Sequence, residues 1–150
     1  LKIEAFENDL QINFIALVKV IQAVLPNLIA SEQSSIVLFS SVAASIGMPF
    51  HTSVASVKSA IEGLVKSLAA EYAPKIRINA IAPTVTDTTL AAKLLRNDRQ
   101  KEQMIERHPL KKYLNPEEVA DMAAFLISDK AASMSGQIFE MDCGITTFKN

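Results

Sequence analysis

The chain has 150 residues and a mass of 16.3 kDa, which is the size of one domain. Its net charge is −1 and its basic residues are scattered, which argues against nucleic acid or an anionic membrane as a partner. Hydrophobic residues make up 49% of the chain and the mean hydropathy is +0.22, so some apolar faces are expected to pack against further protein.

A long amphipathic helix is predicted first, over about residues 3–29. Its apolar residues recur at intervals of three and four, which is the period of one helix face. They are Phe6, Leu10, Phe14, Leu17, Val18, Ile21, Val24, Leu25 and Leu28. The wholly apolar run Ile36-Val37-Leu38-Phe39 follows, as expected of a short strand buried on both faces.

A second helix is predicted from Thr52 or Ser53 to Tyr72, and its apolar side carries Val54, Val57, Ile61, Leu64, Val65 and Leu68. Glu62 and Lys66 are expected to form an i,i+4 pair on its outer face. Residues 75–82 predict the next strand, which Pro83 ends.

A charged helical region is predicted over residues 90–107. The sequence Asn115-Pro116-Glu117-Glu118 then indicates a helix start, because it combines a cap, a proline at the first helical position and a glutamate at the third. That helix is expected to end near Ser128, and residues 137–142 predict the last strand.

Strands separated by helices predict parallel βαβ units with right-handed crossovers. We expect an α/β fold of the Rossmann-like, doubly wound type, with three parallel strands and flanking helices. Three strands form only the second half of such a sheet, so residues 1–150 are interpreted as a single α/β segment. The N-terminal nucleotide-binding half is then either truncated or outside this sequence. No two glycines are close enough to form the G-x-G-x-x-G turn that binds a pyrophosphate.

Five segments carry a more specific signal. They are IVLFSS (36–41), KSAIEGLVKSLAAE (58–71), IRINAIAP (76–83), NPEEVADMAAFLIS (115–128) and SGQIFEMDCG (135–144). In this order and spacing they resemble the C-terminal half of the short-chain dehydrogenase/reductase (SDR) family. The resemblance implies hydride transfer with a nicotinamide cofactor, NAD or NADP.

Ser41 and Lys58 stand where the family has its catalytic serine and lysine. The resemblance implies that Ser41 holds a substrate oxygen and that Lys58 binds the nicotinamide ribose. The alternatives are a turn serine that caps local backbone and a lysine whose ammonium reaches solvent. Val54, thirteen residues after Ser41 and four before Lys58, occupies the position of the family's tyrosine. Valine has no proton to donate, so the usual acid is missing.

Asn13 and His51 are the two other catalytic candidates. Asn13 matches the family's asparagine that positions a water in a proton relay; alternatively it bonds a neighbouring helix carbonyl. His51 lies seven residues before Lys58, where the enoyl-reductase branch carries its tyrosine, and an imidazole can donate a proton near neutral pH. Alternatively it is a loop histidine without reactive contacts. The spacing His51-x-x-Val54-x-x-x-Lys58 also resembles one branch of the family.

The resemblance assigns cofactor contacts to Lys58, Pro83, Val85, Thr86 and Thr88. Two departures from the family pattern stand nearby. Thr84 replaces a glycine, which we expect to hinder close approach of the cofactor. Cys143 replaces another glycine and is interpreted as a small buried residue and not as a nucleophile.

The expected function is an NAD(P)-dependent oxidoreductase that transfers hydride to or from a carbonyl or enoyl substrate, a small molecule. Whether it turns over without the tyrosine stays open. The alternative is a non-catalytic SDR-like nucleotide-binding or interaction protein, and a fragment without function of its own is a third possibility. No metal site is expected. A homo-oligomer, dimer or tetramer, is expected through the apolar faces of the first two helices.

The single cysteine excludes an internal disulfide and fits a reducing compartment, so a cytoplasmic location is expected. No apolar run reaches the roughly 18 residues of a membrane span, and no membrane association is expected. The sequence starts at Leu1, in what reads as the middle of a protein, without a signal-peptide pattern.

Overall fold

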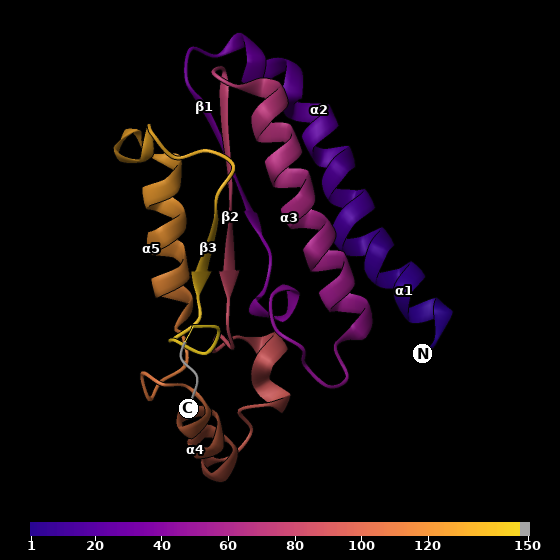
Figure 1. Ribbon diagram of the computed structural model, residues 1–150, viewed down its shortest axis with the longest axis vertical. Helices are drawn as coiled ribbons and strands as arrows, with labels where there is room; N and C mark the ends of the chain where they lie inside the picture. Colours follow the sequence, from indigo (N-terminus) through magenta and orange to yellow (C-terminus); the bar gives the residue numbers. More distant parts are fainter. Residues whose placement is uncertain (148–150) are drawn as a thin grey trace.

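A parallel sheet of three strands lies at the centre of the molecule (Figure 1). The computed structural model describes residues 1–147. The strands β1 (Ser34–Phe39), β2 (Ile76–Pro83) and β3 (Ile138–Met141) are ordered β1-β2-β3. Both pairs are parallel, with Leu38 opposite Ala80 in one and Ile81 opposite Phe139 in the other. The predicted α/β fold with three parallel strands and flanking helices is therefore confirmed.

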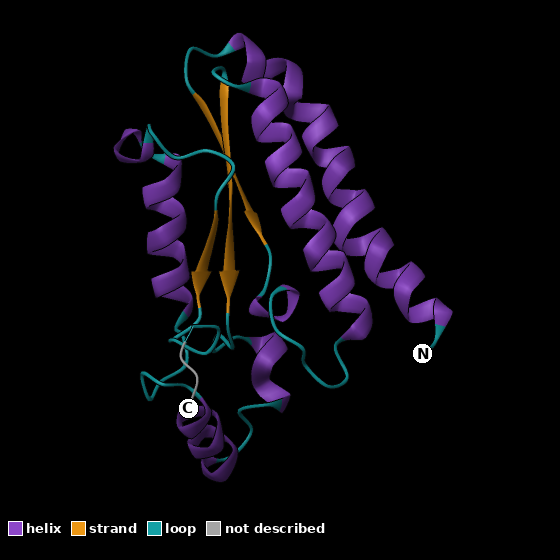
Figure 2. Cartoon of the chain, in the orientation of Figure 1, coloured by secondary structure: helices purple, strands orange, loops and turns teal. Residues whose placement is uncertain are grey.

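Helices cover both faces of this sheet (Figure 2). Helix α3 (Thr52–Tyr72) packs on one face beside the N-terminal helices, and α5 (Pro116–Ile127) packs on the other. Successive strand residues point to opposite faces, so the two sides have separate cores. The α3 side contains Ile21, Leu38, Ile61, Val65, Ala69, Ile76, Ile78 and Ala80, and the α5 side contains Ile81, Leu126 and Ala131. The strand β2 is buried on both faces. The prediction of the same burial for Ile36-Val37-Leu38-Phe39 was wrong in part, because only Leu38 of β1 is buried and Phe39 is 47% exposed.

The predicted first helix forms, but its regular α-helical pattern is interrupted. It consists of α1 (Ile3–Leu10), a π-helical segment (Gln11–Ile15) and α2 (Ala16–Ala30). The predicted helix over about residues 3–29 is confirmed as one helix over Ile3–Ala30, whereas its π-helical segment was not predicted. A π-helical turn adds one residue to the hydrogen-bonded repeat and rotates the following side chains, and such turns are frequent at functional sites.

The same helix, Ile3–Ala30, is long and apolar enough to cross a membrane by length and composition alone. This differs from the expectation that no apolar run has that length. Helices in the core of a domain share these properties, and here Phe14, Leu17, Leu25 and Leu28 pack against the α3-side core. Much of the rest is exposed, so the helix presents a second apolar face away from the sheet.

The long connections lie at the carboxyl ends of the strands. After β2 come a 3-10 helix (Thr89–Lys93) and helix α4 (Asp98–Arg107), which lies below the strand ends in Figure 1. The predicted helix start at Asn115 is also confirmed: α5 begins at Pro116, and the Glu118 carboxylate accepts a hydrogen bond from the Asn115 backbone N–H at 2.9 Å.

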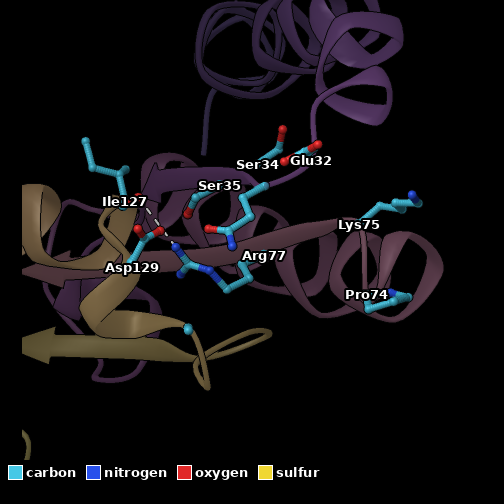
Figure 3. A pocket seen from close by; sticks show the side chains of 10 residues that line it. Glu32, Ser34, Ser35, Pro74, Lys75, Arg77, Ile127 and Asp129 are labelled. Carbon is cyan, nitrogen blue, oxygen red and sulfur yellow. Dashed lines mark hydrogen bonds between the residues drawn. The ribbon is translucent and has the colours of Figure 1, made fainter.

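A small hollow at the opposite, amino end of the strands has a structural role (Figure 3). Arg77, on the α5 side of β2, reaches the end of α5 there. Its guanidinium donates to the carbonyl oxygens of Leu126 at 2.8 Å, Ala131 at 3.0 Å and Ser128 at 3.0 Å. Each of these carbonyl oxygens also accepts a second hydrogen bond, from Ser35, Ala131 or Met134, and the guanidinium uses the remaining lone pairs. Its positive charge lies at the negative end of the α5 dipole, which adds to the stabilisation.

Arg77→Met is expected to lower the free energy of unfolding by about 2–3 kcal/mol, because it removes several charge-assisted hydrogen bonds to the end of α5. Chemical denaturation measures this. Lys75→Met is the matched control: Lys75 lines the same hollow with an exposed side chain, and its loss should change stability by less than about 0.5 kcal/mol. Equal effects of the two substitutions would contradict the assignment.

Candidate active site

An apolar cavity of about 530 Å³ opens at the carboxyl ends of the strands. Ligands of open α/β sheets bind at this edge, because the loops that follow parallel strands gather there. The segment after β1 supplies one wall, the segment after β2 another, and the first turns of α3 a third. The residues that line the cavity are Ser40, Ser41, Val42, Ala43, Met48, His51, Val54, Lys58, Pro83, Thr84, Val85, Thr86, Thr88, Leu90, Ala91, Leu94, Met104 and Arg107.

Most of the residues singled out in the sequence line this one cavity. They are Ser41, His51, Lys58, Pro83, Val85, Thr86 and Thr88, together with Val54. Asn13 is not among them. Residues that sequence reasoning did not single out also line it, chiefly Met104 and Arg107 of α4. The charged region over residues 90–107 was the only sequence signal for that wall.

The two serines after β1 have different environments. Ser40 is buried, with 3% of its surface exposed, and its hydroxyl donates to Glu62 Oε1 at 2.6 Å. The predicted pair of Glu62 with Lys66 was therefore wrong, since Glu62 is turned toward the sheet. The hydroxyl oxygen of Ser41 accepts from the backbone N–H of Ala43 at 3.2 Å, at the start of a 3-10 turn. That bond uses a lone pair, so the Ser41 hydroxyl hydrogen remains available to a ligand.

Lys58 reaches back from α3 to the end of β1. Its Nζ donates to the backbone carbonyl of Phe39 at 2.9 Å, and its side chain is half-buried. Burial lowers the pKa of Lys58 below its ordinary value of 10.5, because desolvation disfavours the ammonium. An ammonium with one fixed carbonyl partner keeps two donors for a ligand.

Val54 and His51 lie on the cavity side of the start of α3. Val54 is one helical turn before Lys58 and offers only apolar surface. The His51 Nδ1 lies 2.7 Å from the carbonyl oxygen of Pro49. A carbonyl can only accept, so Nδ1 carries the hydrogen and the second ring nitrogen, Nε2, is left for another partner.

Asn13 lies in the π-helical segment and its side chain donates to the backbone carbonyl of Asp9 at 3.2 Å. This is the contact named as the alternative to a water-positioning role. The Asp9 carboxylate in turn accepts from the Ser53 hydroxyl at 2.6 Å, which joins the first helix to the start of α3. The π-helical segment therefore lies next to the element that carries His51, Val54 and Lys58.

In the segment after β2, two threonine hydroxyls donate hydrogen bonds to backbone carbonyls of the same segment. Thr86 Oγ1 donates to the carbonyl of Thr84 at 3.1 Å, and Thr88 Oγ1 to that of Thr86 at 3.4 Å. Thr84 has no left-handed backbone conformation, so this position does not require glycine for that reason. Its side chain is buried and turned toward His108, at 2.7 Å between Oγ1 and Nε2.

Cys143 is 7% exposed, in agreement with its interpretation as a small buried residue. Burial raises the pKa of its thiol, which disfavours the reactive thiolate. Its φ of 52° lies in the left-handed region, where glycine is preferred. Within residues 1–147, no group of three or more His, Cys, Asp or Glu side chains is arranged to hold a metal ion.

Three comparisons, with a protein-family model, with sequences of known proteins and with solved structures, agree with the fold and the place of the cavity. Residues 1–146 match the family model described as Enoyl-(Acyl carrier protein) reductase. The chain is 34% identical over 146 residues to the 3-oxoacyl-[acyl-carrier-protein] reductase FabG of Thermotoga maritima, covering 97% of this chain and 58% of that protein. It belongs to the short-chain dehydrogenase/reductase family.

Two further SDR proteins are similar to it. One is the inactive 2-(S)-hydroxypropyl-CoM dehydrogenase 2 of Xanthobacter autotrophicus, 34% identical over 130 residues, with 83% of this chain and 56% of that protein covered. The other is a solved structure, a gluconate 5-dehydrogenase from Burkholderia cenocepacia in complex with NADP and tartrate. It superimposes with a TM-score of 0.92 at 25% identity, covering 99% of this chain and 59% of that one. The chain thus spans a little over half the length of the SDR proteins that it matches.

Lys58→Met is expected to stabilise the protein at neutral pH by up to about 1 kcal/mol, because it removes a desolvated ammonium. The folded pKa of Lys58 is below 10.5, so wild-type stability rises with pH between the folded pKa and 10.5. The variant should lack this rise, and its advantage should disappear above that range. Urea denaturation at neutral and alkaline pH measures both effects.

Lys66→Met is the control for this comparison, since Lys66 lies on α3 with an exposed side chain. It should change neither the stability at neutral pH nor its slope with pH. A loss of stability in Lys58→Met at every pH would mean that the bond to Phe39 outweighs the desolvation of the ammonium.

Proposed function

We propose that this chain forms the substrate-binding and catalytic part of an NAD(P)-dependent oxidoreductase of the short-chain type. The observation that carries the proposal is the convergence of Ser41 and Lys58 on one apolar cavity at the carboxyl edge of the sheet. The substrate is a small molecule with a carbonyl or enoyl group. In reduction, a hydride adds to the electrophilic carbon and a proton to the atom that becomes negative, giving an alcohol or a saturated product.

The roles of Ser41 and Lys58 follow from their hydrogen bonds. The free hydroxyl hydrogen of Ser41 can donate to the substrate oxygen as negative charge develops on it. The Lys58 ammonium, held by the Phe39 carbonyl, adds positive charge at the cavity wall. Both groups stabilise the transition state more than the neutral ground state, which is the condition for acceleration.

The cofactor is NAD or NADP, which would supply or accept the hydride. Its nicotinamide end fits the residues that the family resemblance indicated: Lys58, Pro83, Val85, Thr86 and Thr88 line one cavity. The NADP complex of the similar Burkholderia enzyme supports this assignment. We further propose that these 150 residues are the C-terminal half of the domain, and that the pyrophosphate-binding loop belongs to a segment preceding them in a longer protein. An intact mass well above 16.3 kDa for the natural protein would agree.

We assign the proton to His51, because Val54 has none to give. The Pro49 carbonyl fixes the His51 ring through Nδ1, so that the protonated ring would present its Nε2–H to the product. Asn13 is proposed as a secondary member of the site, since its π-helical segment adjoins α3.

The second candidate is a non-catalytic SDR protein that binds a nucleotide or a partner. The observation that favours it is Val54, which lines the cavity where the family has its acid. A similar Xanthobacter protein is named inactive, which shows that such members of the family exist. The two candidates differ in whether any substrate is turned over.

Turnover of a panel of carbonyl and enoyl substrates with NADH and NADPH is expected for the full-length protein that carries this chain. Lys58→Ala should abolish it. His51→Gln, which removes the titrating group and keeps polarity, should lower kcat by about 10²–10⁴-fold, the usual effect of losing a general acid. Steady-state kinetics by cofactor absorbance gives both results.

Two variants make this experiment decisive. Lys66→Ala, on an exposed part of the same helix, should leave kcat unchanged. Val54→Tyr should restore part of the activity lost in His51→Gln, because it returns a phenol to the family's position. No turnover by the wild type with any substrate, together with measurable cofactor binding, would favour the non-catalytic candidate.

We also propose a homo-oligomer, a dimer or tetramer, that forms through the outer face of α1 and α2. Large apolar side chains are exposed along this face, including Ile12 at 61% and Val20 at 60%. Exposed apolar side chains that gather on one face are typical of an interaction surface. A cytoplasmic location is proposed with it, since the one thiol, Cys143, is free and buried.

Val20→Glu is expected to convert the oligomer into monomers, because it introduces an unpaired charge into the buried interface. Light scattering at micromolar concentration measures the mass. Leu110→Glu is the matched control, with 63% exposure at a position far from this face, and should keep the oligomer intact. A monomeric wild type would refute the proposal.

A further inference from the structure

One wall of the cavity is supplied by a helix without a buried residue of its own. Met104 and Arg107 of α4 line the cavity, yet no residue of Asp98–Arg107 is buried. Burial of apolar surface is the main force that fixes a helix on a domain, and here Met104 and Ile105 are only partly buried. Contacts at the ends of the helix therefore gain weight in fixing the position of this wall.

His108, directly after α4, provides such a contact. Its side chain is 1% exposed and both ring nitrogens are engaged. Nδ1 lies 2.7 Å from the carbonyl oxygen of Met104, in the last turn of α4, and Nε2 lies 2.7 Å from Thr84 Oγ1, directly after β2. Because a carbonyl only accepts, Nδ1 carries the hydrogen, and in the neutral imidazole Nε2 accepts from the Thr84 hydroxyl.

The backbone after His108 is tied to the same edge of the sheet. Leu110 donates to the carbonyl of Cys143 at 3.1 Å, and Leu114 to that of Val85 at 3.0 Å. These bonds hold the chain that leaves α4, but they do not reach the helix itself. The imidazole does, since it joins the Met104 carbonyl to the Thr84 hydroxyl. The pair Thr84–His108 is thus a direct link between α4 and the segment of Val85 and Thr86.

We propose that His108 is a positioning residue that holds the α4 wall of the substrate cavity at the correct distance from the cofactor segment, acting through Thr84 and Met104. The proposal deepens the proposed oxidoreductase function and rests on it for its kinetic consequence. The substrate touches Met104 and Arg107 and not His108, so the link affects substrate affinity and leaves the chemical step unchanged. Thr84, which replaces a glycine of the family, supplies the hydroxyl that glycine lacks.

Thr84→Val tests the link, because it removes the hydroxyl and keeps the shape of the side chain. Hydrogen exchange of the α4 amides should accelerate by about tenfold, the effect of losing one buried hydrogen bond locally. Exchange in β2 and α3 should not change. Thr84→Ser keeps the hydroxyl and should retain the wild-type exchange. These measurements use the full-length protein and need no substrate, so they stand apart from whether the protein is an enzyme.

His108→Asn gives an independent test, because asparagine can keep the bond to Met104 but is too short to reach Thr84. It should reproduce the exchange of Thr84→Val. With an active substrate, both variants should raise KM by about tenfold at unchanged kcat, and Thr84→Ser should restore the wild-type KM. Unchanged α4 exchange in Thr84→Val or His108→Asn would overturn the proposal. Equal acceleration throughout the protein, or a fall in kcat at constant KM, would overturn it as well.

Discussion

The burial of β2 on both faces is the constraint on which the rest of the structure depends. Ile76, Ile78, Ala80, Ile81 and Ala82 have at most 1% of their surface exposed. A strand covered on both sides requires helical crossovers, and these make the neighbouring strands parallel. Parallel strands end at one edge, so the polar residues that follow β1 and β2 meet there with the start of α3. The candidate active site is a consequence of that topology before any catalytic residue is considered.

The elements of the fold could be predicted where a local pattern determines them. Four apolar residues in a row indicated β1, and the cap and proline at Asn115-Pro116 indicated the start of α5. The π-helical segment Gln11–Ile15 could not be predicted, because an apolar stripe does not reveal whether a hydrogen bond spans four residues or five. The partner of Glu62 was missed for a related reason. Helix spacing favoured Lys66, whereas the buried Ser40 hydroxyl competes from another element.

Some residues of the candidate site could also be identified from the sequence, whereas others are revealed only by the structure. Ser41, Val54 and Lys58 were identified through the resemblance to the SDR family, and the fold brings all three to one cavity. The link between Thr84 and His108 spans 24 residues and depends on how α4 returns to the sheet, so no local pattern reveals it. Thr84 was interpreted from sequence as a hindrance to the cofactor. That stays a prediction. The structure adds that its side chain points toward His108 and that its backbone does not adopt the left-handed conformation that only glycine tolerates easily. Cys143, by contrast, does adopt it, at a φ of 52°.

The environment of Lys58 bears on the choice between an enzyme and a non-catalytic protein. A half-buried ammonium with one carbonyl partner is unfavourable for stability, since water would solvate it better than the Phe39 carbonyl does. A protein that only binds a partner gains nothing from such a group at the wall of an apolar cavity, whereas a nucleotide-binding protein would use it as a hydrogen-bond donor. An oxidoreductase would also use its charge, because a positive charge of low solvation stabilises developing negative charge more strongly there than in water. Valine at position 54 offers no proton, but it leaves this electrostatic arrangement intact. The environment of Lys58 therefore supports a ligand-binding role for its ammonium, which the proposed oxidoreductase function requires.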